Sequence, residues 1–167
     1  MRVNFTDPAD LWHHIEATLP RGGVVAISGF GGAGKTELGK ALGRDKHGIQ
    51  LIHGDDYLDW PLACQRQQNG EAVIFDSILR AHINPFRAGR KPVRWLIVES
   101  IQIFTEQRQR HFDYRIWVDT PIDQANANGQ ARDAQNQQLW DDIWVPNDLD
   151  FDRAHHPRQY ADATYTW

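Results

Sequence analysis

Residues 26–38 read AISGFGGAGKTEL, and this stretch predicts how the rest of the chain folds. Gly29, Gly34, Lys35 and Thr36 match the pattern G-x-x-x-x-G-K-[ST], a loop whose backbone N–H groups surround an anion. The glycines allow backbone conformations that other residues rarely adopt. In such a loop the lysine supplies positive charge to the β- and γ-phosphates of a nucleotide, and the threonine hydroxyl is a ligand for Mg²⁺.

The residues on either side provide the strand and the helix that this loop requires. Residues 22–28, GGVVAIS, form a short β-branched run typical of a buried strand, and residues 35–44 predict a helix that stops near Gly43. The positive end of that helix points at the same anion. This context disfavours the alternative of a glycine-rich turn without a ligand. We therefore expect the phosphates to bind to Gly29, Phe30, Gly31, Gly32, Ala33, Gly34, Lys35 and Thr36.

Beyond the loop, apolar runs alternate with segments of helical spacing. Further strands are expected at residues 49–54, 93–100, 114–119 and 161–167, and helices at 6–19, 71–83 and 121–144. Thr6 is the expected N-cap of the first helix, ahead of Pro8. Strands that alternate with helices and are apolar on both faces indicate an α/β fold, with a five-stranded parallel sheet and helices on both faces. In such sheets a ligand binds beyond the carboxyl ends of the strands.

Composition limits the classes of protein that need to be considered. The chain has 167 residues, 41% of them hydrophobic, which suits one compact domain over residues 1–167. Its net charge of −4 does not favour a nucleic-acid or membrane partner. We see no secretory signal and no run of about 18 apolar residues. The single cysteine excludes an internal disulfide, so we expect a soluble, cytoplasmic protein.

Acidic residues follow three of the expected strands. Asp55 and Asp56 follow the second, where a carboxylate can accept the proton of an attacking hydroxyl, bind magnesium, or simply form a turn. Glu99 ends the third strand, a position where a carboxylate helps to hold the metal of a phosphate loop. Asp119 ends the fourth strand, but ahead of Pro121 it is more typical of a helix cap. Trp60 lies close in sequence to the Asp pair and can either pack under a loop or stack on the ring of a ligand.

Three motifs together resemble the uridine kinase-like group of P-loop kinases, relatives of which include nicotinamide riboside kinase and bacterial pantothenate kinase. GFGGAGKTEL is similar to the opening of that group, HGDDYL to its acceptor-side element, and IVESI to its third strand end. The resemblance implies a three-layer P-loop NTPase sandwich. It identifies Asp55 as the catalytic base, Tyr57 as an aromatic that shapes the acceptor pocket, and Glu99 as the acid at the third strand end. From their positions in the sequence, Trp60 is a further candidate for the acceptor pocket, and Thr36, Glu99 and Asp55 are candidate groups around Mg²⁺.

The resemblance also implies a short helical lid, at about residues 121–138, that carries arginines. Arg132 and Asp133 match the end of that lid, whereas Asn126, Asn128 and Gln130 stand where another arginine is expected. We expect Arg132 to act as the catalytic cation with Lys35. Fewer lid cations leave less charge stabilisation for the moving phosphoryl group. Arg153 and Arg158, nearer the end of the sequence, are candidates to replace the missing arginine.

Three functions are compatible with these residues. The first is an ATP- and Mg²⁺-dependent kinase acting on a hydroxyl of a nucleoside-like or vitamin-like small molecule. The second is another P-loop activity, such as an ATPase or a nucleotide switch, although the N-K-x-D element of GTPases is absent from the sequence. The third is a nucleotide-binding protein that has lost transfer. Intact Lys35, Thr36, Asp55 and Glu99 favour the kinase.

Overall fold

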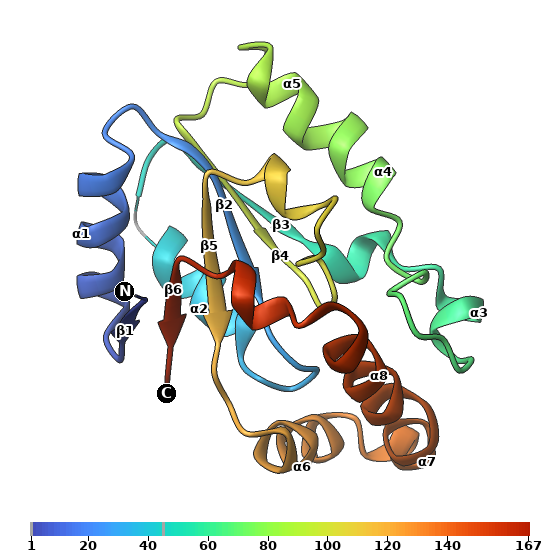
Figure 1. Ribbon diagram of the computed structural model, residues 1–167. Coiled ribbons are helices and arrows are strands. Elements are labelled where there is room, and N and C mark those ends of the chain that lie inside the picture. The colour runs from blue at the N-terminus through green and yellow to red at the C-terminus, as the bar shows by residue number, and fades with distance from the viewer. Residues whose placement is uncertain (1, 45) are drawn as a thin grey trace.

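The computed structural model describes residues 2–44 and 46–167, and its centre is one parallel sheet (Figure 1). Across these residues six strands pair in the order β1-β6-β5-β2-β4-β3, every neighbouring pair parallel. The strands are β1 (Val3–Phe5), β2 (Gly23–Ser28), β3 (Ile49–His53), β4 (Trp95–Glu99), β5 (Tyr114–Val118) and β6 (Ala163–Tyr165). The predicted α/β class and the parallel sheet are confirmed.

The expected number of five strands was wrong, because β1 adds a sixth strand at the edge of the sheet beside β6. β1 has three residues and is largely exposed, so it carries neither an apolar run nor an alternation that could reveal it. Pairing with β6 holds it in place. The amide of Thr166 donates to the carbonyl of Phe5 at 2.9 Å, and the hydroxyls of Thr164 and Thr166 donate to the side chain of Asn4.

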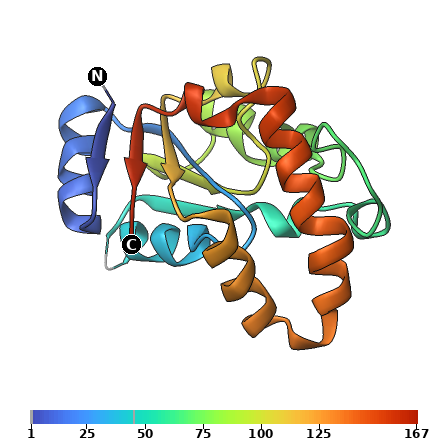
Figure 2. The same cartoon turned by 60° about the horizontal axis from the view of Figure 1, so that its bottom comes forward.

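Helices cover both faces of the sheet, as predicted. Figure 2 shows α2 on one side of the strands and the helical segment of residues 75–87 on the other. The helices are α1 (Pro8–Thr18), α2 (Lys35–Gly43), α3 (Trp60–Ala63), α4 (Phe75–Ile78), α5 (Asn84–Arg87), α6 (Ile122–Arg132), α7 (Gln137–Leu139) and α8 (Val145–His155). A π-helical turn, Leu79–Ile83, joins α4 to α5. None of these helices is long and apolar enough to cross a membrane.

The expected N-cap of α1 is corrected by one residue. Asp7, not Thr6, caps the helix: its carboxylate accepts hydrogen bonds from the amides of Ala9 at 2.7 Å and Asp10 at 3.2 Å. Pro8 occupies the start of the helix, where the missing N–H is not needed. The residue directly before that proline is therefore the one whose side chain reaches the first free amides.

The segment that follows β5 is helical well beyond the expected lid at about residues 121–138. After α6 and α7 comes a π-helical turn, Trp140–Trp144, and then α8. Pro146 would ordinarily predict a helix end, but it stands in the first turn of α8 and the wide turn precedes it. Figure 1 shows α6, α7 and α8 lying beyond the carboxyl end of β5.

Candidate functional site

The predicted phosphate loop joins β2 to α2 at the carboxyl end of the sheet. Gly32 and Gly34 have φ angles of +79° and +96°, in the left-handed region that favours glycine, and Gly34 caps α2. The Lys35 side chain is buried, and its Nζ donates to the Phe30 carbonyl at 2.7 Å. The sequence therefore forms the curled loop that its glycines predict.

Lys35 is a buried cation among acidic neighbours. Burial lowers the pKa of Lys35, and the nearby carboxylates of Asp148, Glu99 and Asp55 oppose that change. Such a charge is costly to bury without a partner, so the site favours an anion beside it. The loop thus has the amides and the positive charge that a phosphate needs.

Glu99 connects the loop with the end of β3. It stands opposite Ile27 and His53 in the sheet, and its carboxylate accepts from the Thr36 hydroxyl at 3.1 Å and pairs with His53 Nδ1 at 2.8 Å. Burial raises the pKa of Glu99, while His53 and Lys35 counter it. Sequence reasoning missed His53, although its place at a strand end beside Asp55 is a signal.

The oxygen donors at this point fit the predicted Mg²⁺. A hydroxyl and a carboxylate, supplied by Thr36 and Glu99, are the hard ligands that Mg²⁺ prefers, with waters and phosphates completing its shell. Among the described residues no group of three His, Cys, Asp or Glu side chains forms a metal site by itself. Mg²⁺ does not ordinarily require an all-protein cage, so the site of Thr36, Glu99 and Asp55 stays a prediction.

Asp55 lies in a helical turn, Gly54–Tyr57, directly after β3. Gly54 permits this course, because a Cβ there would approach the Ser100 side chain to 2.2 Å. The Asp55 side chain is exposed and makes no hydrogen bond within residues 2–44 and 46–167. Asp55 lines a pocket, whereas the neighbouring Asp56 does not.

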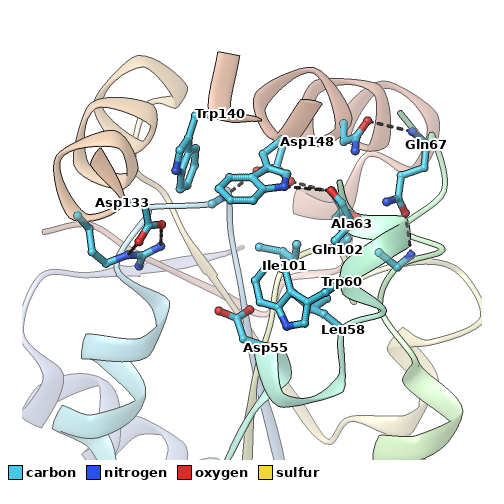
Figure 3. Close-up of a pocket in the computed structure, with 15 residues that line it drawn as sticks. Asp55, Leu58, Trp60, Ala63, Gln67, Ile101, Gln102, Asp133, Trp140 and Asp148 are labelled. Carbon is cyan, nitrogen blue, oxygen red and sulfur yellow. Dashed lines mark hydrogen bonds and ion pairs between the residues drawn. The ribbon is translucent and has the colours of Figure 1, made fainter. Parts of the chain in front are cut away.

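We call this cavity the tryptophan pocket (Figure 3). It has a volume of about 110 Å³, is partly open to solvent, and reaches the phosphate loop at Gly31. In Figure 3, Asp55 and Trp60 lie on one side and Trp140 and Asp148 on the other. Its apolar lining residues include Leu58, Trp60, Ile101, Trp140 and Trp144. Its polar lining residues include Asp55, Gln67, Gln102, Arg132, Asp133, Asn147 and Asp148.

Asp148 connects α8 with the phosphate loop. Its Oδ2 accepts the Gly31 amide at 2.7 Å and its Oδ1 accepts Gln102 Nε2 at 2.9 Å. Burial raises the pKa of this carboxyl, and the Gly31 amide and Lys35 oppose the change. Trp140, Trp144 and Asp148 were missed, yet they recur every fourth residue, a spacing that predicts one helix face.

The structure brings some predicted residues to the pocket and leaves others outside. Arg132 lines it and pairs with Asp133 at 3.0 Å. Tyr57 was expected to shape the acceptor pocket, but it does not line the tryptophan pocket. Its hydroxyl instead hydrogen-bonds to His82. The two arginines proposed as replacements lie elsewhere within the described chain: Arg153 pairs with Asp150, and Arg158 with Asp119 at 3.1 Å.

A second surface pocket lies at the other end of the phosphate loop, and we call it the Trp167 groove. Ala33, Gly34, Thr120, Gln124 and Trp167 are among its lining residues. The indole N–H of Trp167 and the hydroxyl of Thr120 both donate to the Ala33 carbonyl, at 3.2 and 2.9 Å. Trp167 keeps 58% of its surface exposed, so a flat aromatic face remains available beside the loop.

Comparison with known proteins identifies the fold. No protein-family model matches the chain, and no curated protein matches it by sequence. Among solved structures, a possible uridine kinase from Bacillus stearothermophilus aligns with a TM-score of 0.71 at 13% identity, over 95% of this chain and 96% of that one. A Thermus thermophilus protein, TT1252, aligns with a TM-score of 0.53 at 14% identity, over 86% and 87% of the two chains. The chain therefore shares the fold of that possible uridine kinase, an α/β fold built on a parallel sheet.

Proposed function

We propose that the protein transfers the γ-phosphoryl group of ATP to a hydroxyl of a nucleoside-like or vitamin-like small molecule. The observation that supports this most directly is that the phosphate loop lies between the tryptophan pocket and the Trp167 groove. The Trp167 groove adjoins Ala33 and Gly34, and the tryptophan pocket adjoins Gly31 and contains Asp55. A nucleotide base and an acceptor can therefore occupy opposite ends of one phosphate site.

In this proposal each residue has one role in the transfer. The acceptor oxygen forms a bond to the γ-phosphorus as the bond to the β–γ bridging oxygen breaks, and ADP leaves. Asp55 aligns the acceptor hydroxyl and takes its proton, late in a loose transition state. Lys35 and Arg132 offset negative charge on the moving group. Mg²⁺, when bound, supplies further positive charge, and Thr36 and Glu99 would hold it.

A second candidate is a nucleotide-binding protein or ATPase of the same fold with weak transfer or none. Two observations favour it: the lid arginine that lines the pocket, Arg132, is engaged by Asp133, and the carboxylate of Asp148 already holds the Gly31 amide. The Arg132–Asp133 ion pair and the Gly31–Asp148 hydrogen bond must both break or rearrange before a terminal phosphate can accept hydrogen bonds from Arg132 and Gly31.

A coupled ADP-release assay with a panel of nucleosides, vitamins and sugars separates the candidates. The kinase proposal expects turnover that depends on one class of acceptor. ADP release that does not depend on any acceptor would indicate an ATPase instead. Nucleotide binding without turnover on any panel member would favour the binding protein.

A further inference from the structure

Four loops enter the sheet at its amino end, opposite the phosphate loop. They are residues 19–22, 46–48, 87–94 and 111–113, which lead into β2, β3, β4 and β5. Figure 1 shows the loops before β2, β4 and β5 at the other end of the sheet from α6 and α8. The Arg94 amide donates to the Gly48 carbonyl at 2.8 Å, and the Gly23 amide donates to the Arg94 carbonyl at 3.1 Å. Arg87 joins the fourth loop through an ion pair of 2.7 Å with Asp113. The four loops therefore form one surface, which we call the amino-end face.

The amino-end face carries an excess of positive charge. Asp113 is the one acidic residue of these described loops, and it is already engaged by Arg87 and by the Val24 amide at 2.8 Å. Lys46 is directed to the helices, where its Nζ donates to the Leu42 carbonyl at 2.8 Å. The remaining basic residues of the face are Arg21, Arg90, Lys91 and Arg94.

These four cations have hydrogen-bond donors left for a ligand. Arg21 and Arg90 are exposed, and no hydrogen bond or ion pair engages their side chains within residues 2–44 and 46–167. Arg94 is exposed and donates from Nη2 to the Pro20 carbonyl, which leaves most of its five N–H groups. Lys91 Nζ donates to Gln50 at 3.0 Å and contacts His82 Nδ1 at 3.2 Å, which leaves one of its three N–H groups.

The net charge of the whole chain, −4, does not cancel this local charge. The acids of the lid segment lie beyond the carboxyl end of the sheet, and β2 alone spans six residues, about 20 Å at roughly 3.3 Å per residue. Charges in water are largely screened beyond about 8 Å at physiological ionic strength. An anion at the amino-end face therefore interacts with the arginines there and hardly at all with the acids of the lid segment.

The amino-end face lacks the apolar side chains that other kinds of partner need. The exposed large apolar residues of the described chain are Val3, Trp60, Ile74, Leu149 and Trp167, and none belongs to these four loops. A specific protein partner needs an apolar or aromatic centre, and stable membrane binding needs apolar insertion or a lipid anchor. A single strand of nucleic acid needs aromatic faces on which its bases stack. The phosphate backbone of a duplex needs only cations and hydrogen-bond donors.

We propose that the amino-end face binds the sugar–phosphate backbone of a double-stranded nucleic acid without reading its base sequence. Arg21, Arg90 and Arg94 each present a planar fork that can hold two phosphate oxygens, and Lys91 adds a point charge. This binding goes beyond the proposed function and does not depend on it, because the phosphate loop lies at the other end of the sheet.

The salt dependence of duplex binding tests the proposal. The probe is a fluorescently labelled DNA duplex of about 24 base pairs, and anisotropy with the full chain measures its affinity. Four phosphate contacts predict a slope of about −3.6 for log K against log salt concentration, and so a loss of roughly a hundredfold between 50 and 200 mM salt. A duplex of unrelated sequence should bind within about twofold, because no base edge is read. No binding at 50 mM salt, or affinity that is independent of salt, would overturn the proposal.

Variants locate the binding. Arg21→Ala and Arg90→Ala should each reduce the size of the salt slope by about one, since each removes one phosphate contact. Arg153→Ala is the matched control, because it removes an equal charge from an exposed position of α8, and its slope should equal that of the wild type. Lys35→Met should bind the duplex normally. If Lys35→Met abolishes binding while Arg21→Ala and Arg90→Ala leave it unchanged, the duplex binds at the phosphate loop and the proposal is wrong.

Competition against the labelled duplex separates the other polyanions. The competitors are the unlabelled duplex, a single strand of the same length, vesicles that contain phosphatidylserine, and polyglutamate of equal total charge. The proposal expects the unlabelled duplex to compete about tenfold more strongly than any other, because its phosphates are the most densely spaced. Stronger competition by the single strand, the vesicles or the polyglutamate would assign the face to that kind of partner and overturn the proposal.

Discussion

Asp148 accepts a hydrogen bond of 2.7 Å from the backbone amide of Gly31, although the two residues lie 117 positions apart. The contact joins α8 to the phosphate loop, since Asp148 belongs to α8 and Gly31 to the loop after β2. A carboxylate and a phosphate are both anions that seek such amides. Asp148 therefore occupies an amide donor that a phosphate bound in this loop would also seek.

Replacing Asp148 with Asn should tighten nucleotide binding. Two like charges about 4 Å apart repel by about 4 kcal/mol at an effective dielectric constant of 20, so removing part of that repulsion should lower the Kd for ATP roughly tenfold. The decrease should be smaller for ADP, which lacks the terminal phosphate. Titration calorimetry measures both, with Asp142→Asn as the control for charge alone. Weaker ATP binding in Asp148→Asn would mean that the carboxylate helps to build the loop instead.

The same variant should change how stability depends on pH. Burial raises the pKa of Asp148 above its ordinary value of 3.8, so the folded protein keeps a proton that the unfolded chain releases. Wild-type stability should fall as pH rises from the unfolded pKa through the folded one. Asp148→Asn lacks this loss. The free energy of unfolding of the variant, minus that of the wild type, should therefore be smallest near pH 4 and grow with pH. Denaturant unfolding at a series of pH values measures this difference. If the difference grew as the pH was lowered, the raised pKa of Asp148 would be contradicted.

Lys35→Met should separate binding from stability. The lysine charge is buried, and methionine keeps most of its apolar stem. We expect ATP affinity to fall by about a hundredfold or more, because charge beside the β- and γ-phosphates is lost. The free energy of unfolding should stay the same or rise, since a desolvated cation is removed. A folded variant that binds ATP normally would exclude the role assigned to Lys35.

Arg132→Ala should mainly lower kcat. Arg132 is exposed and its salt bridge with Asp133 is partly solvated, so stability should change by less than about 1 kcal/mol. Its charge matters most as the phosphoryl group moves, and we expect a loss of roughly a hundredfold in kcat with KM for ATP within a few-fold. Steady-state kinetics with the best panel acceptor measures this. An unchanged kcat would exclude Arg132 as the catalytic cation.

Sequence patterns predicted those parts of the fold that local chemistry determines. The glycine and lysine pattern of residues 29–36 is specific to a phosphate-binding loop between a strand and a helix. The apolar runs that form β2, β4 and β5 are long enough to identify strands. The edge strand β1 was missed because three mostly exposed residues have no periodicity of their own. Their pairing depends on β6, which is far away in sequence.

The candidate site could be predicted only where a motif carries it. Lys35, Thr36, Glu99 and Asp55 stand at strand ends, and the parallel sheet brings those ends together. Asp148 could not be chosen among the acids of residues 141–152, because its role arises from a long-range contact with Gly31. Pro146 suggests that the predicted helix ends near Trp144, so α8 and its Asp148 were not predicted. In the structure Pro146 stands in the first turn of α8, after a π-helical turn.

The central claim is that Asp55, and not its neighbour Asp56, aligns and deprotonates an acceptor hydroxyl beside the phosphate loop. Asp55 lines the tryptophan pocket and Asp56 does not, so exchanging each for Asn makes a matched pair. Asn keeps the shape of the side chain but cannot accept the proton. The deciding measurement is acceptor-dependent ADP release, with ATP affinity measured in parallel. We predict that Asp55→Asn keeps ATP affinity within a few-fold and loses most transfer, whereas Asp56→Asn has a milder effect. Normal turnover in Asp55→Asn, or a larger loss in Asp56→Asn, would contradict the account.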